Sequence, residues 1–436
     1  MYTVARRLGL LLAVIVSLMV IVNTSPAADR PNIVLIISDD QAWNDYGFMG
    51  HEHIQTPRLD QLSKQGLTFR RGYVPCSLCR ASLMAMFTGL YPHQNGITSN
   101  DPPAPAAANG KQRGRGPQFA KLREEMNQYV TKSPTLARVL GEHGYMSLQT
   151  GKWWEGHWRN GGFTHGMTQG ERHGDAGLDI GRKTMQPVFD FINESQQAGK
   201  PFFVWYAPML PHSPHNPPER LLNKYRSVAP SDSVAKYWAC VEWFDEGCGQ
   251  LLDHLAERKL SDNTIVAYVT DNGWLQDPTA DKYAVKSKQS QYDGGLRTPI
   301  MIRWPGKIAP QTSEALAMSI DLMPTLLHAA NITPPAGLPG INLLDPAAVA
   351  ARKTIYGECF THNAVDLHKP ATSLKWRWCI DGQLKLIVPE TANVPGEVVE
   401  LYDLAADPWE RMNLAAERSA EVNRLQKLLD AWWPGK

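Results

Sequence analysis

Pro31-Asn-Ile-Val-Leu-Ile-Ile-Ser-Asp-Asp40 is the stretch of sequence that decides the fold class. The run from Asn32 to Ser38 is almost continuously apolar, which is typical of a strand that is covered on both faces in a parallel sheet. Two aspartates follow this run directly. Binding sites in parallel sheets gather beyond the carboxyl ends of the strands, so the stretch predicts a buried strand with an acidic site at its end.

Strand and helix patterns alternate along the chain on both sides of this point. Thr56-Pro57 and Ser133-Pro134 each begin a helix with a capping residue and a proline in the first turn. A long helical stretch runs from about Ser233 to Arg258. Further strand candidates are Phe202–Tyr206, Thr264–Thr270 and Ile300–Arg303. We therefore predict an α/β domain with a mostly parallel central sheet flanked by helices.

The domain boundary falls where proline and glycine become frequent, near Ile332 to Pro346. Beyond it, short strand-like pieces precede a helix around Ala420 to Trp433. We expect residues 29–345 to form the main domain and residues 346–436 a smaller C-terminal α+β subdomain. Residues 100–132, with a basic stretch at Lys111–Arg115, are expected to form an irregular insertion. It is either a solvated loop or a flap that guides a polyanionic substrate.

The N-terminus has the pattern of a secretory signal. Arg6 and Arg7 precede an apolar run from Leu8 to Val22, and Ser25-Pro-Ala-Ala28 follows. The run is shorter than the roughly 20 residues that span a bilayer. We expect residues 1–28 to be a signal peptide that is cleaved near Ala27, giving a periplasmic or secreted protein without a stable membrane anchor. An uncleaved anchor is the alternative.

Charge and cysteine content exclude two protein classes. The formal net charge is +1, so no global attraction for nucleic acid is expected. Cys240 and Cys248 fall on one predicted helix, roughly 12 Å apart by helical rise, which is too far for a disulfide. Cys359 and Cys379 could pair on neighbouring strands. The chain is therefore not a disulfide-stabilised scaffold.

Hard oxygen donors follow two of the predicted strands. Asp39-Asp40 follows the first strand, and Asp271-Asn272 follows Thr264–Thr270. Both pairs can face one crevice beyond the carboxyl edge of the sheet. Three carboxylates and an amide suit Ca²⁺ or Mg²⁺ rather than zinc. We expect one divalent cation, with Ca²⁺ preferred over Mg²⁺, although the ligand types alone do not separate the two.

Cys76-Ser-Leu-Cys-Arg80 stands at the predicted start of an apolar helix that ends near Thr88-Gly89. A helix start offers free backbone N–H groups and positive dipole charge, which suits a nucleophile acting on an anionic ester. Together with Tyr91-Pro-His93, the segment resembles the signature of the type I sulfatases, Cys-x-Pro-x-Arg followed by Thr-Gly and Tyr-Pro-His. In that family a formylglycine-generating enzyme oxidises the cysteine to formylglycine. Leu78 stands where the family has proline.

The resemblance to the type I sulfatases extends over most of the chain. Matching segments are Pro31–Asp40, Thr270–Gly273, Gly151–Trp153, Pro211–Pro214, Lys288–Gly295, Arg297–Pro299, Trp304–Gly306 and Leu401–Leu414. The resemblance implies an alkaline-phosphatase-like fold and hydrolysis of sulfate monoesters, either of sulfated carbohydrates or of aryl sulfates. The metal ligands that it implies are Asp39, Asp40, Asp271, Asn272 and the oxidised Cys76.

The same resemblance implies a reaction path. The hydrated aldehyde at Cys76 attacks sulfur and forms a covalent sulfated intermediate. The cation, Arg80, Lys152 and Lys288 stabilise the charge on the sulfate oxygens. His212 protonates the departing alcohol, and His215 is a neighbour that could take this role.

Trp154 is the second departure, because the family has histidine there. An indole cannot exchange a proton near neutral pH, so the work of that histidine is lost, moved or unnecessary. His157 and His165 are nearby candidates, and Trp154 could form a sugar-binding face. Two alternative functions remain open. One is a phosphate or phosphonate monoester hydrolase, and the other is a non-catalytic protein that binds sulfated glycans.

Overall fold

The computed structural model describes residues 30–104 and 116–435. The predicted signal peptide and the basic stretch Lys111–Arg115 lie outside these ranges. Within them, no helix combines the length and apolar character that crossing a membrane requires.

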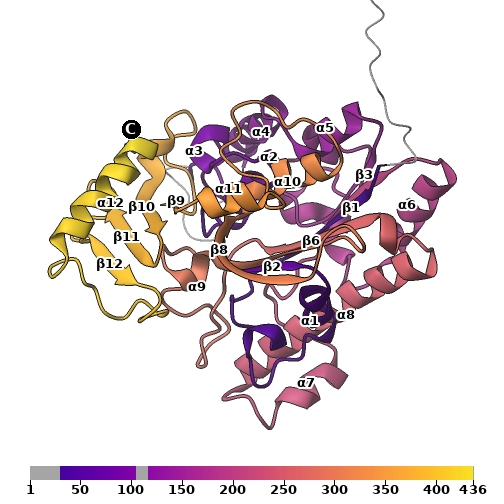
Figure 1. Ribbon diagram of the computed structural model, residues 1–436, viewed down its shortest axis with the longest axis horizontal. Helices are drawn as coiled ribbons and strands as arrows, with labels where there is room; N and C mark the ends of the chain where they lie inside the picture. The colour runs from indigo at the N-terminus through magenta and orange to yellow at the C-terminus, as the bar shows by residue number, and fades with distance from the viewer. Residues whose placement is uncertain (1–29, 105–115, 436) are drawn as a thin grey trace, which may run out of the picture.

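An eight-stranded sheet forms the centre of the molecule (Figure 1). In spatial order its strands are β4 (His165–Gly166), β3 (Met146–Gly151), β5 (Phe202–Ala207), β1 (Asn32–Ser38), β6 (Thr264–Thr270), β7 (Arg297–Arg303), β2 (Leu67–Tyr73) and β8 (Gln311–Met318). β1 is parallel to both of its neighbours, β5 and β6. β7 runs antiparallel to β6 and β2. The prediction of a mostly parallel central sheet is therefore confirmed.

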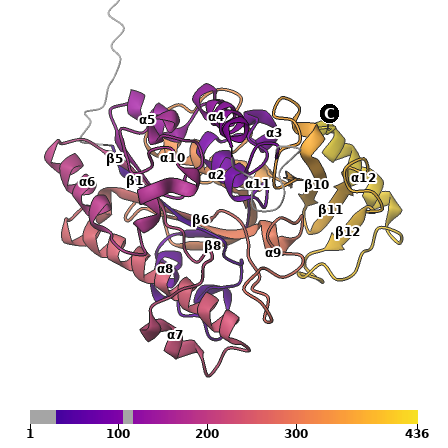
Figure 2. The same cartoon turned by 180° about the vertical axis from the view of Figure 1, so that it is seen from behind.

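Helices cover both faces of this sheet, as Figures 1 and 2 show. On one face, alternate β1 residues such as Leu35 pack against α2, α4, α5 and α10. On the other face, Val34 and Ile36 pack against α1, α6 and α8. These helices are α1 (Pro57–Gln65), α2 (Cys79–Thr88), α4 (Pro117–Lys132), α5 (Leu136–Glu142), α6 (Gln186–Gln197), α8 (Asp232–Glu257) and α10 (Leu322–Ala329). Burial on both faces explains why the β1 sequence is apolar without alternation.

A second, four-stranded antiparallel sheet forms the C-terminal part, in the order β12-β11-β10-β9. Its strands are β9 (Thr354–Phe360), β10 (Leu374–Asp381), β11 (Leu384–Pro389) and β12 (Glu400–Asp403). Leu425 and Leu429 of α12 (Ser419–Trp432) cover one face. Trp378 and Ile387 on the opposite face pack against Tyr73 of the large sheet. The smaller α+β part is confirmed, and its boundary at 345/346 stays a prediction.

The shorter helices connect these layers. They are α3 (Pro92–Asn95), α7 (Glu219–Tyr225), α9 (Asp293–Leu296) and α11 (Pro346–Ala351).

We predicted an irregular insertion over residues 100–132. This is wrong for residues 117–132, which form helix α4. Pro117 occupies the first turn after Gly116, where its missing N–H costs nothing. Phe119, Met126 and Val130 are buried at helical spacing and hold α4 against the core.

The six cysteines are all free thiols. Cys240 and Cys248 lie on α8, as predicted from their spacing. Cys359 and Cys379 lie on adjacent strands, but the register places Cys359 opposite Trp376. The possible pairing of these two cysteines is therefore wrong.

Candidate active site

The site lies where four neighbouring parallel strands end. Asp39-Asp40 follows β1, and Asp271-Asn272 follows β6. The two strands are in register at their last residues, and the backbone N–H of Asp271 donates to Ser38 O at 2.9 Å. Lys152 follows β3 directly, and His212 lies in the segment after β5. The parallel topology thus brings residues that are distant in sequence to one edge of the sheet.

The four acidic and amide side chains form a buried cluster with unsatisfied oxygens. Asn272 Nδ2 donates to Asp40 Oδ1 at 2.7 Å, and Asp40 N donates to Asp271 Oδ1 at 3.0 Å. Within the described residues, Asp39 Oδ1, Asp271 Oδ2 and Asn272 Oδ1 are buried without a hydrogen-bond partner. Burial, together with Asp39 and Asp40, raises the pKa of Asp271 well above its usual value. Three crowded carboxylates with free oxygens fit a divalent cation of the Ca²⁺ or Mg²⁺ type.

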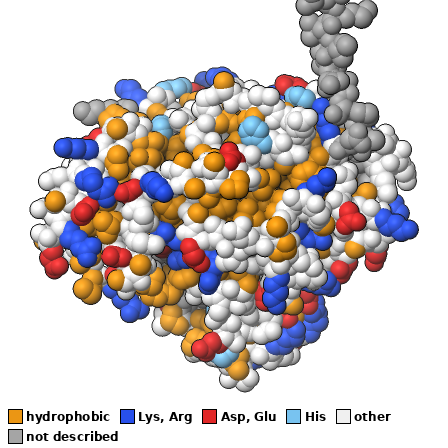
Figure 3. Space-filling view, viewed as in Figure 1, with side chains coloured by type: hydrophobic (Ala, Val, Ile, Leu, Met, Phe, Trp, Pro, Cys, Tyr) orange, Lys and Arg blue, Asp and Glu red, His pale blue; other side chains and the backbone are white. Residues whose placement is uncertain are grey.

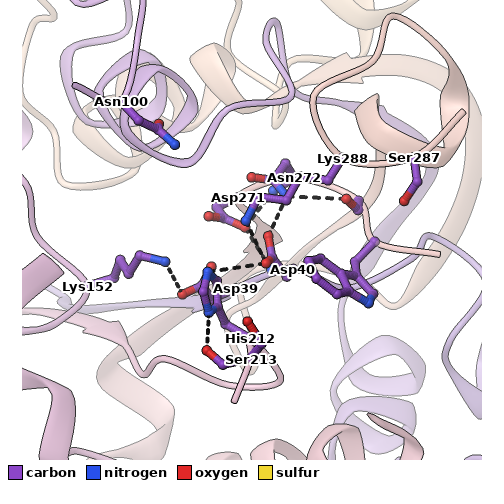
Figure 4. Close-up of polar contacts among 12 residues, drawn as sticks. Asp39, Asp40, Asn100, Lys152, His212, Ser213, Asp271, Asn272, Ser287 and Lys288 are labelled. Atoms are coloured by element: carbon purple, nitrogen blue, oxygen red, sulfur yellow. Dashed lines mark hydrogen bonds and ion pairs between the residues drawn. The ribbon is translucent and has the colours of Figure 1, made fainter. Parts of the chain in front are cut away.

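Two lysines and a histidine surround this cluster, as Figure 4 shows. Lys152 Nζ lies 2.7 Å from Asp39 Oδ2, and Lys288 Nζ lies 2.6 Å from Asp40 Oδ2. Both lysines are buried. Burial favours the neutral amines, but Asp39 and Asp40 outweigh it and raise the pKa of both lysines. The site therefore holds two fixed positive charges beside its carboxylates.

His212 is held in a defined orientation. Its Nδ1 lies 2.5 Å from Ser213 O, which can only accept, so Nδ1 carries the proton. Its Nε2 lies 3.4 Å from Asp40 Oδ2. Burial, helped by the charge of Lys152, lowers the pKa of His212 to about 4. The imidazole is thus neutral at neutral pH and directs Nε2 toward the acidic cluster.

The cysteine beside the cluster is Cys79, for which the sequence predicted no role. One ligand atom each of Asp39, Asp40, Cys79 and His212 lie within 4.8 Å of one another. α2 begins at Cys79, so this residue occupies the helix start that had been expected near Cys76.

Cys76 lies outside this group. It is buried in an apolar cluster with Leu78, Ala81 and Phe360. We expected Cys76 at the metal site, but the residue found there is Cys79, three positions further along the chain. The reason is that the segment from Cys76 to Leu78 precedes the helix. The sequence offers no signal that separates Cys79 from Cys76, because the start of α2 at Cys79 is visible only in the folded chain.

Arg80 is also placed differently from the expectation that it contacts the substrate. The guanidinium is fully buried, and its Nε and NH2 atoms lie 2.7 and 2.6 Å from the two carboxylate oxygens of Glu155. NH2 also donates to Asn127 Oδ1 at 2.8 Å, and NH1 donates to Asn100 O at 3.4 Å. Because these donors are used within the protein, Arg80 ties α2 to the segment after β3 rather than lining the cavity.

A cavity of about 310 Å³ opens above the cluster. Besides Cys79, His212 and Lys288, its lining includes polar and aromatic residues to which the sequence assigned no role. These are Asn100, Arg172, His173, Ser213, Trp274, Asp281, Lys282, Tyr283, Gln289 and His362. They come from separate loops, so no single stretch of sequence could have identified them. The cavity has aromatic and basic walls and reaches the acidic cluster through Cys79, His212 and Lys288.

A larger cavity, of about 690 Å³, lies elsewhere on the molecule. Its lining is mostly apolar and includes Trp304, Ile308, Leu344 and Val349. Hydrophobic side chains gather over the centre of the face shown in Figure 3, where α11 lies. This larger cavity lacks a cluster of titratable side chains. The smaller cavity is therefore the candidate active site.

Trp154 and the histidines other than His212 that were candidates for the site lie in different places. Trp154 is buried but lines the cavity, and its Nε1 has no partner within the described residues. His157 and His165 do not line the cavity, and His165 Nε2 lies 3.4 Å from Glu194. His215 packs against Trp274, with ring centroids 5.7 Å apart, and is also absent from the cavity lining. Of these histidines and His212, only His212 belongs to the group of ligand atoms with Asp39 and Asp40.

Comparison with known proteins connects this geometry to a family. Residues 31–332 match a family model described as Sulfatase, and residues 282–431 match one described as N-sulphoglucosamine sulphohydrolase, C-terminal. The chain is 25% identical to N-acetylgalactosamine-6-sulfatase from Canis lupus familiaris, over 92% of this chain and 85% of that protein. It is 29% identical to arylsulfatase A from Homo sapiens, over 72% of this chain and 66% of that protein.

A solved structure shows the same fold. It is a protein in complex with its substrate D-glucosamine-2-N,6-O-disulfate, and it matches with a TM-score of 0.72 at 20% identity. The match covers 93% of this chain and 98% of that chain.

Proposed function

Because the chain belongs to the sulfatase family, a family of sulfuric ester hydrolases, we propose that it is an exported enzyme that hydrolyses sulfate monoesters of carbohydrates. The observation that carries this proposal is the convergence at one sheet edge of Asp39, Asp40, Cys79 and His212. Lys152 and Lys288 add positive charge at the same place. A sulfate monoester needs this combination of anion-stabilising charge, a nucleophile and a proton donor.

We assign the nucleophile to position 79. Burial raises the pKa of the Cys79 thiol, so the unmodified cysteine would be a poor nucleophile at neutral pH. The family resemblance instead implies oxidation by a formylglycine-generating enzyme, and the hydrated aldehyde supplies an attacking hydroxyl. The position of Cys79 among the acidic residues supports this assignment over Cys76.

A divalent cation fits the unsatisfied oxygens of Asp39, Asp271 and Asn272, with Asp40 beside them. We propose Ca²⁺ as the resident ion. When bound, it neutralises the carboxylates and polarises the sulfate oxygens.

The remaining steps belong to side chains of the chain itself. Lys152 and Lys288 hold the sulfate oxygens and stabilise the charge that develops on them. His212 carries its proton on Nδ1, which is bonded to Ser213 O, so it must gain a proton at Nε2 before it protonates the departing alcohol. Nε2 faces the cluster, where it can take that proton when the nucleophile is activated.

The substrate class follows from the cavity and from the relatives. Trp154, Trp274 and Tyr283 give the cavity aromatic faces, which can pack on the apolar faces of sugar rings. The matched relatives named above include an N-acetylgalactosamine-6-sulfatase and a structure bound to a sulfated glucosamine. We therefore place sulfated sugars ahead of simple aryl sulfates as the natural substrate.

Peptide mass spectrometry tests the assignment of the nucleophile. Trypsin cleavage after Arg71 and Arg80 releases Gly72–Arg80, which contains both cysteines. In protein from a host that has the maturation enzyme, fragment ions should locate the conversion of thiol to aldehyde at Cys79. Cys79→Ala should abolish turnover, whereas the matched variant Cys76→Ala should retain it. An aldehyde at Cys76 would contradict the assignment.

Turnover of paired substrates tests the reaction class. We expect 4-nitrophenyl sulfate to be hydrolysed faster than 4-nitrophenyl phosphate. A preference for phosphate would instead identify a phosphate or phosphonate monoester hydrolase. Unmodified Cys79 together with binding of sulfated glycans, but no turnover, would identify a non-catalytic binding protein.

A further inference from the structure

His173 occupies the cavity wall beside Trp154, although the two residues come from different segments. Their ring centroids lie 4.2 Å apart with an edge-to-face arrangement. His173 is also 6.3 Å from His212, measured between ring centroids. Cys79 lines the same cavity. His173 therefore places an imidazole next to Trp154, whose indole cannot exchange a proton near neutral pH.

The backbone at His173 is held in an unusual conformation. Its φ is 74°, in the left-handed region that residues other than glycine rarely adopt. The carbonyl of His173 accepts a hydrogen bond from Trp153 N at 2.9 Å. The following Gly174 approaches Gly151 so closely that a Cβ atom would lie 2.2 Å from the Gly151 carbonyl oxygen. The loop is thus fastened to the end of β3, and a strained residue beside a cavity indicates a functional constraint.

Arg172 fixes the tautomer of this imidazole. Its NH1 lies 2.8 Å from His173 Nε2, and a guanidinium can only donate, so Nε2 accepts and Nδ1 carries the proton. Arg172 is itself held by Asp101, with Nε and NH2 at 3.0 and 2.8 Å from the two carboxylate oxygens. Burial and the nearby charges of Lys152 and Arg172 keep the pKa of His173 far below its usual value. The imidazole is therefore a neutral donor through Nδ1.

We propose that His173 supplies an imidazole hydrogen-bond donor to the site from a separate loop, and that its Nδ1–H contacts the bound sulfate ester. The assignment rests on the proposed sulfatase function. Arg172 and Asp101 position His173, because Arg172 donates to its Nε2 and Asp101 holds Arg172.

Three substitutions at position 173 test this role while separating it from backbone strain. His173→Gly removes the donor and relieves the strain. His173→Asn places an N–H near Nδ1 and tolerates positive φ, and His173→Gln places an N–H near Nε2. We expect His173→Gly and His173→Gln to lose about 100-fold in kcat/KM for 4-nitrophenyl sulfate. His173→Asn should stay within about tenfold of the parent protein.

The matched control is His165→Ala, because His165 lies near in sequence but outside the cavity. It should leave kcat and KM unchanged, and thermal melting should show that every variant is folded. Parent activity in His173→Gly would overturn the proposal. Rescue by glutamine rather than asparagine, or an equal loss in all three folded variants, would also overturn it.

A binding measurement decides the proposal even if the parent protein proves inactive. In the Cys79→Ala background, calorimetry would measure the Kd of 4-nitrophenyl sulfate with and without His173→Gly. We expect binding to weaken about tenfold, as one charge-assisted hydrogen bond is lost. An unchanged Kd would exclude a contact between His173 and the ester, and an inactive parent protein would count against the proposed function alone.

Discussion

Single oxygen atoms determine what the acidic cluster can bind. Asp39 Oδ1, Asp271 Oδ2 and Asn272 Oδ1 are buried without a donor among the described residues. Lys152 and Lys288 bond to the other oxygens, on Asp39 and Asp40. Burying unpaired carboxylate oxygens costs several kcal/mol unless a cation compensates them. The folded state should therefore bind a divalent ion much better than the unfolded chain does.

This difference in affinity predicts stabilisation by Ca²⁺. After chelator treatment, adding Ca²⁺ should restore sulfate ester hydrolysis and raise Tm. At a hundredfold excess over Kd, the free energy of unfolding should rise by about 2.7 kcal/mol. Asp271→Asn removes one charged ligand and should reduce the shift in Tm, whereas the exposed Asp262→Asn should not. Identical melting of the chelated and Ca²⁺-loaded protein would contradict the cation site.

At the scale of secondary-structure elements, the position of Lys152 depends on how β3 ends. Gly151 has a φ of +70° and packs against the neighbouring strand β5. A Cβ atom at this position would lie 1.8 Å from the carbonyl oxygen of Ala207. The two strands can reach this separation only with glycine, and the close contact directs the chain to Lys152.

Gly151→Ala should therefore affect both stability and activity. We expect a loss of about 2–5 kcal/mol in the free energy of unfolding, from backbone strain and overpacking. Activity per folded molecule should also fall, because Lys152 shifts away from Asp39. Urea unfolding and turnover would measure the two effects. Gly141→Ala in α5 is the control, since its Cβ meets no atom within 4 Å and should stabilise the helix by up to about 1 kcal/mol.

Elements with a strong local pattern were predictable from sequence, and so was the part of the site that they carry. The apolar run of β1 and the polar pair after β6 predicted where Asp40 and Asp271 meet. The start of α2 could not be predicted, because Cys76 and Cys79 both stand beside the apolar stretch and only the folded chain shows that the helix begins at Cys79.

Loop residues of the site could not be predicted in this way. His173 reaches the cavity through the packing of Gly174 on Gly151 and through a pair between Arg172 and Asp101, which are 71 positions apart. Such contacts depend on the tertiary structure and leave no periodic pattern in the sequence.

For the whole molecule, one buried lysine connects the two sheets. Lys385 on β11 is inaccessible to solvent, and its Nζ lies 2.8 Å from Asp293 Oδ1 and 2.7 Å from Glu410 Oε1. Asp293 begins α9, which follows the loop that carries Lys288. Asp293 N also donates to Glu410 Oε2 at 2.6 Å. The C-terminal part is thereby joined to the segment that completes the active site.

Replacing this lysine should weaken the molecule as a unit. Lys385→Met leaves Asp293 and Glu410 buried without a cation, which should cost about 3–5 kcal/mol. Burial and Asp293 already raise the pKa of Glu410 to about 7 with the lysine present. Without the lysine, which lowers it, the folded-state pKa of Glu410 rises further. The folded state then binds more protons than the unfolded state, so the loss of stability should be larger at pH 8 than at pH 5.5.

Urea unfolding followed by tryptophan fluorescence at the two pH values measures this effect. The triple variant Lys385→Met, Asp293→Asn, Glu410→Gln removes the buried charges together, so it should recover part of the stability and lose most of the pH dependence. Lys427→Met on the exposed side of α12 is the control and should leave the unfolding curve unchanged. Two buried carboxylates without a cation must destabilise the folded state. A Lys385→Met protein with the stability of the parent would therefore show that this cluster does not connect the two sheets.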